Sequence, residues 1–170
     1  MALKHKELVA EEIPWRFTQK EAIAFSGQQL VPVFADLDQT IADSWEIARY
    51  LETTYPDRPS LFGGSVGEAQ ALFIKFWCEQ AFHPIVFRLI LPDLFERIHQ
   101  KDKEYFLSSP DPRFGMTLEE IALPTESAIS TLNKTLEPLR ATLKCQPNLG
   151  GTFLVSLTTL CLVLSNLREL

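Results

Sequence analysis

Two neighbouring pairs of residues have the types needed to hold a small ligand that carries both an amine and a carboxylate. Val31-Pro32 lies inside an apolar run, and Asp43-Ser44 opens a segment with a helical pattern. Proline cannot donate to a strand ladder and can hold a cis peptide bond, so the backbone N–H and C=O of Val31 are expected to be available to a ligand's own backbone. The alternative for this pair is an ordinary proline of an edge strand.

The second pair has the pattern of a helix start. Asp43 fits the N-cap position, and Glu46 completes a capping box. Ser44 then falls in the first turn, where unpaired N–H groups and the helix dipole favour an anion. We expect the Ser44 N–H and hydroxyl to donate to a ligand carboxylate and the Asp43 carboxylate to meet a ligand ammonium. Simple capping is the alternative, and the nearby Val31-Pro32 favours the ligand site.

Together these residues resemble the cytosolic glutathione S-transferase family. Its N-terminal thioredoxin-like domain has a Val-Pro step before a β-hairpin, then a helix that opens with Glu/Asp-Ser and continues as Ile-Ala-x-Tyr-Leu. The matching elements here are Val31-Pro32, Asp43-Ser44 and residues 47–51, and residues 55–62 look like the interdomain linker. Residues 15–17, 25–28 and 83–84 are similar to bacterial and fungal members near the β-aryl etherase branch.

The resemblance implies a role for each matching residue. Val31 would pair its backbone with the cysteinyl part of glutathione, and Pro32 would be the family's cis-proline. Asp43 and Ser44 would take the γ-glutamyl ammonium and carboxylate. Many members place Lys or another polar residue just before the Val-Pro step, where this chain has Leu30. Glutathione is therefore the implied cosubstrate, no metal is implied, and the second partner would be a small apolar electrophile.

The amino end departs from the family pattern. Members begin with a β-strand and a loop whose Ser, Tyr or Cys activates the glutathione thiol, whereas residues 1–6 resemble the end of the helix that follows. A thiol has a pKa of about 8.5 and reacts as the thiolate, so a transferase needs a donor aimed at sulfur. Thr18, Ser26, Ser44 and Tyr50 do not match that donor by motif. We therefore expect an N-terminally truncated chain without a catalytic residue: an impaired transferase or, alternatively, a non-catalytic binding module.

Composition predicts a globular cytoplasmic protein. The chain has 170 residues, of which 46% are hydrophobic, and its net charge of −6 leaves no basic footprint for nucleic acid. Three cysteines without a C-x-x-C motif argue against a disulfide framework and for a reducing compartment. The charged residues 1–6 lack the apolar core of a signal peptide.

The elements that would position the two pairs follow from hydrophobic patterns. We predict a strand over residues 8–17, a short helix over 18–25, a hairpin over 31–42 that turns at 36–39, and a helix over 43–54. Ile47, Tyr50 and Leu51 should form the buried face of that helix. Glycines and prolines between Pro56 and Gly67 mark a linker. The predicted fold is an α+β thioredoxin-like domain over 1–62, missing its first strand, and an all-α domain over 63–170.

The second half of the chain has a helical period. Two apolar stripes are predicted to be core, with interruptions at Pro84, Pro124 and Pro138; they comprise Ala69, Leu72, Phe73, Phe76 and Trp77, and Leu118, Ile121, Ala122, Ile129, Leu132, Leu136, Leu139 and Leu143. The alternative for Phe73, Phe76 and Trp77 is the lining of an apolar cosubstrate pocket.

The carboxyl end also departs from the family, whose members continue there with a capped helix containing a buried Asp. Residues 152–164 are almost wholly apolar and contain no Asp. A bilayer-spanning helix needs about 20 residues, so we expect a divergent packed helix and no membrane anchor. His5, His83 and His99 have no partner at metal-ligand spacing. Members of the family usually dimerise, which makes a homodimer an expectation here as well.

Overall fold

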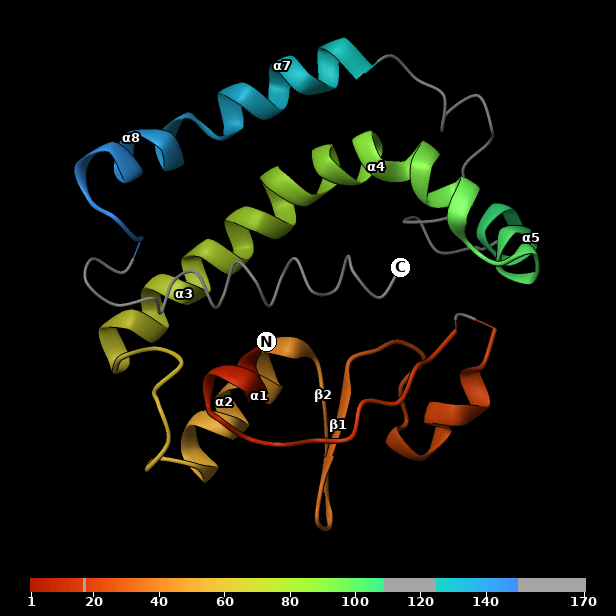
Figure 1. Ribbon diagram of the computed structural model, residues 1–170, viewed down its shortest axis with the longest axis vertical. Coiled ribbons are helices and arrows are strands. Elements are labelled where there is room, and N and C mark those ends of the chain that lie inside the picture. Colours follow the sequence, from red (N-terminus) through yellow and green to blue (C-terminus); the bar gives the residue numbers. More distant parts are fainter. Residues whose placement is uncertain (17, 109–124, 150–170) are drawn as a thin grey trace.

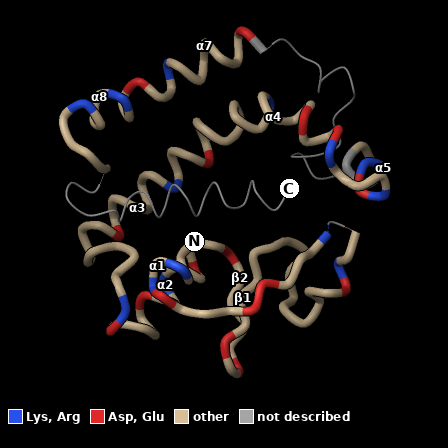
Figure 2. Tube along the Cα trace, in the orientation of Figure 1, with Lys and Arg blue, Asp and Glu red and all other residues tan. Residues whose placement is uncertain are grey.

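The computed structural model describes residues 1–16, 18–108 and 125–149. A small α/β part at the amino end lies below a set of longer helices in the view of Figure 1. Charged residues of both signs are spread over both parts, with acidic residues at the tip of the hairpin (Figure 2). The expectations for Phe17, Leu118, Ile121, Ala122, Pro124 and residues 152–164 fall outside the described residues.

The predicted hairpin is confirmed. Strand β1 (Val33–Asp36) pairs with β2 (Gln39–Ala42) in antiparallel fashion, and the register runs from Val33 opposite Ala42 to Asp36 opposite Gln39. Leu37 and Asp38 make the turn, and the Leu37 backbone has a positive φ of 51°. The hairpin therefore ends at the acidic residues that the sequence indicated.

The strand predicted over residues 8–17 is wrong for the part that the structure describes. Residues 8–16 have no regular structure, and the side chains of Val9 and Ile13 are 101% and 80% exposed. A strand forms where its alternate side chains meet a core and its backbone pairs with another strand. Leu8 packs against the core, but residues 8–16 pair with no strand among the described residues. The short helix that follows is a 3₁₀ helix, η1 (Lys20–Ser26), which ends at Gly27 with a left-handed φ of 69°.

Helix α2 (Ser44–Thr54) contributes most to the core of the amino-terminal part. Ile47, Ala48 and Leu51 are buried and Tyr50 is half-buried, so the predicted buried face is confirmed and Ala48 is added to it. The same cluster includes Ala2 of α1 (Ala2–His5), Leu61 and Phe62 of the connection, and Ala71 of the next helix.

A buried ion pair links α1 to α2. The Lys6 side chain is 1% exposed, and its Nζ lies 2.8 Å from Glu52 Oε2 and donates to the Tyr55 carbonyl at 3.2 Å. Glu52 also accepts from the Leu61 N–H at 2.9 Å and from the Ser60 hydroxyl. Burial acts to raise the pKa of Glu52, but the donors around it outweigh burial and hold that pKa below its usual value.

The connection to the helical part ends earlier than predicted. Helix α3 (Ser65–Trp77) begins after Gly64, so Gly67 lies in its first turn rather than in a linker. A Cβ on Gly67 would lie 1.7 Å from the Phe62 carbonyl oxygen. Glycine at this position lets the first turn of α3 pack directly against the backbone of the core residue Phe62.

The interruption predicted at Pro84 takes the form of a π-helical segment. This segment, η2 (Cys78–Phe82), joins α3 to α4 (His83–Arg97), and the three form one long helical run in Figure 1. The His83 N–H donates to the Cys78 carbonyl, a bond one residue longer than in an α-helix. Pro84 has no N–H to donate, which accounts for a change of hydrogen-bond register just before it.

None of the described residues of the two predicted stripes is fully buried, although half of them are half-buried, namely Leu72, Trp77, Leu132, Leu136 and Leu139. Phe73 and Phe76 on α3 are 72% and 48% exposed, and Ala69 is also exposed. Ile129 and Leu143 are exposed, and none of the residues of α8 is buried. Helix α7 packs against α4 and η2. A periodic apolar stripe predicts only that one face of a helix is apolar, and it does not predict which element covers that face.

The remaining helices are α5 (Gln100–Ser108), α7 (Thr125–Thr135) and α8 (Glu137–Cys145). Pro138 stands in the first turn of α8, so the predicted break between two helices is confirmed there. Among the described residues, no helix is long and apolar enough to cross a membrane.

Candidate functional site

The register of the hairpin brings both predicted pairs to one place. Val33 and Ala42 form the last pair at the open end, so Pro32 and Asp43 are the next residues on the two strands. Opposed Cα atoms in an antiparallel pair lie about 4.5–5.5 Å apart. The structure therefore gathers Val31, Pro32, Asp43 and Ser44 at one end of the hairpin.

The Val31-Pro32 peptide bond is cis, as the sequence allowed. Both residues are half-buried and lie outside β1. The N–H and C=O of Val31 therefore take no part in the β1–β2 ladder, which starts at Val33.

Asp43 is the N-cap of α2 and has a strained backbone. Its Oδ1 accepts from the Trp45 N–H at 2.8 Å and from the Glu46 N–H at 3.2 Å, while Oδ2 takes part in neither bond. Its φ of 73° and ψ of 131° are unfavourable for a residue with a Cβ, at a cost of about 1–3 kcal/mol. The Glu46 carboxylate turns instead to Arg49, at 3.7 Å, so only the Asp43 half of the predicted capping box forms.

Ser44 is the first residue of α2 and is half-buried. The N–H at this position of a helix has no intrahelical acceptor. Among the residues that the structure describes, no group hydrogen-bonds to the Ser44 hydroxyl. The exposed Asp43 carboxylate thus lies beside the N-terminus of α2, where the Ser44 N–H and hydroxyl can donate hydrogen bonds. This arrangement suits a ligand group that carries both an ammonium and a carboxylate.

The other hydroxyls considered from the sequence are already bonded. Thr18 donates to Asp102 Oδ1 at 3.1 Å, and Ser26 donates to the Ile23 carbonyl at 2.6 Å. Tyr50 donates to Asp36 Oδ2 at 3.1 Å. Each of these three hydroxyls therefore has an acceptor within the protein.

Asp36 is a residue whose role the sequence did not reveal. Its Oδ2 accepts from Tyr55 at 2.5 Å as well as from Tyr50, so it joins β1 to the last part of α2 and the residue after it. Burial and then the Asp36 hydrogen bond raise the pKa of Tyr50, and the same carboxylate is the leading cause that raises the pKa of Tyr55. Tyr50 and Tyr55 are five residues apart and Tyr55 lies just outside α2, so no helical spacing indicated that they share one acceptor.

The two described cysteines differ in environment. Cys78 is fully buried in η2, and burial raises the pKa of its thiol to about 11. Such a thiol stays protonated at neutral pH and is a poor nucleophile. Cys145 is exposed near the end of α8.

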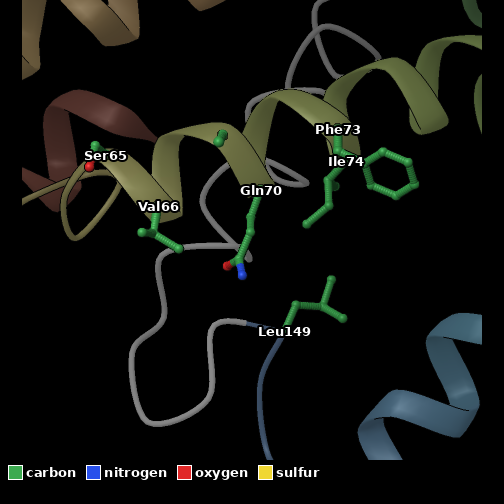
Figure 3. Close-up of a pocket in the computed structure, with 7 residues that line it drawn as sticks. Ser65, Val66, Gln70, Phe73, Ile74 and Leu149 are labelled. Atoms are coloured by element: carbon green, nitrogen blue, oxygen red, sulfur yellow. The ribbon is translucent and has the colours of Figure 1, made fainter.

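A cavity of about 610 Å³ lies along α3. It is lined mostly by apolar side chains, namely Val66, Ala69, Phe73, Ile74 and Leu149, together with Ser65 and Gln70. In Figure 3 the side chains of Val66 and Gln70 extend from α3 toward the side where Leu149 lies. Of the three aromatic residues considered for a pocket, Phe73 lines this one, whereas Trp77 stacks on Phe82 with ring centroids 6.0 Å apart.

The histidines are not gathered together. The described residues contain no group of three or more side chains suited to a metal ion. His5 Nε2 lies 2.9 Å from the Ser60 carbonyl oxygen. His83 Nε2 is buried without a partner among the described residues, and burial lowers the pKa of that imidazole.

The fold combines a thioredoxin-like part with an all-helical part, the architecture of glutathione transferases. The sequence model of the glutathione S-transferase C-terminal domain matches residues 69–158, more than half of the chain. This protein therefore belongs to the glutathione S-transferase family.

One relative and two solved structures show how far the similarity extends. The glutathione S-transferase-like protein ustS of Aspergillus flavus is 34% identical over 91 residues, which are 53% of this chain and 32% of that protein. The match thus spans about a third of the relative's length.

Two solved structures share the fold. A glutathione S-transferase from Rhodospirillum rubrum F11 superposes with a TM-score of 0.70 at 24% identity, over 98% of this chain and 70% of its own. A mutant of poplar glutathione transferase F1 gives 0.63 at 20% identity, over 95% and 71%.

Proposed function

We propose that this chain binds glutathione at the open end of the hairpin. The cis Val31-Pro32 step would present the Val31 backbone to the cysteinyl part of the ligand. Asp43 would receive the γ-glutamyl ammonium, and Ser44 the γ-glutamyl carboxylate. The observation that carries this proposal is the strained N-cap Asp43, which keeps Oδ2 out of its capping bonds beside the first turn of α2.

The charges at the site match those of the γ-glutamyl group. An ammonium beside Asp43 would face a carboxylate, and a carboxylate at Ser44 would face amide groups and the positive end of the α2 dipole. Hydrogen bonds to charged groups contribute about 1.5–3 kcal/mol each. An uncharged analogue of the same shape would lose both contacts, so the site favours a free α-amino acid end.

In this proposal the described side chains bind glutathione but do not activate its thiol. Thr18, Ser26 and Tyr50 already donate their hydroxyl protons to protein acceptors. Cys78 is buried and protonated. An impaired transferase and a non-catalytic binding module share this site, and they differ only in whether the bound thiol reacts with an electrophile.

We divide the roles between the two predicted domains: residues 1–62 would bind glutathione, and residues 63–170 would supply the site of the second substrate. The cavity along α3 would accept a small apolar electrophile, because its lining is mainly aliphatic and aromatic.

Calorimetry of glutathione binding tests the site. Ser44→Ala should weaken binding by about tenfold or more, because it removes a hydrogen bond to a charged group. Thr53→Ala is the matched control: it removes an exposed hydroxyl at the other end of α2 whose bonds are to backbone carbonyls of the same helix. S-methylglutathione should bind as well as glutathione, and the dipeptide Cys-Gly should not bind.

Equal affinity of Ser44→Ala and the unmodified chain would refute the assignment of Ser44. Absence of binding by the unmodified chain would refute the function. Conjugation of glutathione to a chromogenic aryl halide, measured on the same samples, separates the two alternatives: turnover above the uncatalysed rate identifies a transferase, and its absence with intact binding identifies a binding module.

A further inference from the structure

One lysine of the amino-terminal part lies between two aromatic rings that come from distant parts of the chain. Lys20 Nζ is 5.4 Å from the centroid of the Trp15 ring and 5.4 Å from that of Tyr105. Lys20 begins η1, whereas Tyr105 belongs to α5 of the helical part. An ammonium within about 6 Å of a ring centroid is attracted to the face of the ring, and two rings add their attraction.

A second contact joins the same two segments. The Thr18 hydroxyl donates to Asp102 Oδ1 at 3.1 Å, and Asp102 of α5 is only 6% exposed. The Trp15 Nε1–H donates to the Gln19 carbonyl at 2.8 Å, which fixes the ring that faces Lys20. Thr18 and Lys20 are thus attached to α5 by a hydrogen bond and an ion–ring contact.

The lysine also reaches toward the proposed ligand site. Lys20 Nζ donates to the Gln29 carbonyl at 2.7 Å, and Gln29 lies just before Leu30 and Val31. Between Lys20 and Gln29 the helix η1 ends at Gly27, whose backbone is left-handed, and residues 27–30 are exposed. A short, exposed segment of this kind has few contacts of its own to hold its backbone in place.

We propose that Lys20 is a positioning residue, which fixes the Gln29–Val31 backbone to α5 and so lets the helical part determine the geometry of the glutathione site. This inference rests on the proposed function, since Val31 is the residue that would pair with the ligand backbone. Without Lys20, the ligand would have to order Gln29 to Val31 on binding, and its affinity would fall by that cost.

Three substitutions separate this role from general effects. Lys20→Met keeps the length of the side chain and removes the charge, and Lys20→Arg keeps a cation that can stack on both rings. Tyr105→Leu removes the ring on α5 without changing the net charge. The matched control is Lys101→Met, an exposed lysine of α5.

Glutathione affinity by calorimetry is the first measurement. Lys20→Met should weaken binding by about tenfold (about 1.4 kcal/mol). Tyr105→Leu should weaken it by about threefold, which loss of positive charge cannot explain. Lys20→Arg should restore most of the affinity, and Lys101→Met should leave it unchanged. Equal affinity of Lys20→Met and the unmodified chain would overturn the proposal.

Hydrogen exchange of the ligand-free chain is the second measurement and does not depend on glutathione. Exchange over residues 21–32 should be faster in Lys20→Met and Tyr105→Leu, and unchanged in Lys101→Met. Unchanged exchange in Lys20→Met would overturn the attachment, and faster exchange with unchanged affinity would overturn the positioning role. If the unmodified chain binds no glutathione, the proposed function fails, and exchange alone then supports or overturns the attachment to α5.

Discussion

Removal of the carboxylate from the Lys6–Glu52 pair should be among the most damaging single changes in the amino-terminal part. The Lys6 side chain is 1% exposed and that of Glu52 is 24% exposed, with 2.8 Å between the charged atoms. Glu52→Gln would leave a buried ammonium without a counter-charge, with only neutral oxygens to accept from it: the new side-chain amide and the Tyr55 carbonyl. Breaking a buried ion pair in this way costs about 3–5 kcal/mol, and the partial exposure of Glu52 favours the lower end.

The two halves of the pair should not be equivalent. Lys6→Met would leave Glu52, which is partly exposed and still accepts from Ser60 and Leu61. We therefore expect a smaller loss, about 1–2 kcal/mol, since the carboxylate keeps other donors. The double variant should be less destabilised than the sum of the two single variants, because it leaves no unpaired buried charge.

Denaturant unfolding followed by circular dichroism measures these free energies of unfolding. Glu46→Gln is the control, because Glu46 and Arg49 form an exposed pair at 3.7 Å whose contribution should be about 0–1 kcal/mol. A Glu52→Gln variant within the error of the unmodified chain, or a Lys6→Met variant that is the less stable of the two, would refute this account of the pair.

Three further outcomes are expected. The pKa of Glu52 is lowered in the fold, so its contribution to stability is present above its unfolded value of about 4.3 and is lost as the pH falls through the folded pKa. The free energy of unfolding of the unmodified chain should therefore fall more steeply with decreasing pH than that of Glu52→Gln. An equal fall in the two proteins would contradict this expectation. Asp43→Asn should keep the cap, change stability by less than about 0.5 kcal/mol and weaken glutathione binding by about tenfold or more; unchanged affinity would remove Asp43 from the site. Gly67→Ala should destabilise by about 1–3 kcal/mol in denaturant unfolding, because its Cβ would overlap the Phe62 carbonyl, whereas the Ala substitution at exposed Gln70 should not.

The elements that sequence predicted correctly are those that local chemistry defines. Asp43 caps α2 because its side chain reaches amides two and three residues ahead. The hairpin turns within residues 36–39, where Asp36, Asp38 and Gln39 interrupt the apolar run. The buried face of α2 followed from the spacing of Ile47 and Leu51. Each of these signals lies within a few residues of the feature that it predicts.

The errors concern features that depend on distant parts of the chain. Residues 8–16 have a strand-like composition, but Val9 and Ile13 meet no core and remain exposed. The sequence predicts Gly67 to be a linker glycine, although its role is set by the Phe62 backbone packed against it. The exposure of Phe73 likewise depends on what packs against α3, and its periodicity carries no information about that partner.

The sequence by itself determined which residues could recognise a zwitterionic ligand, because Val31-Pro32 and Asp43-Ser44 carry their chemistry in their types and local spacing. Only the tertiary structure decided that the pairing of β1 with β2 places them at one end of the hairpin. It also decided that Lys6 is buried against Glu52, and that Lys20 connects α5 to Gln29. The contacts of Lys6 with Glu52 and of Lys20 with Tyr105 join residues far apart in the chain, and their geometry exists only once the helices have packed together.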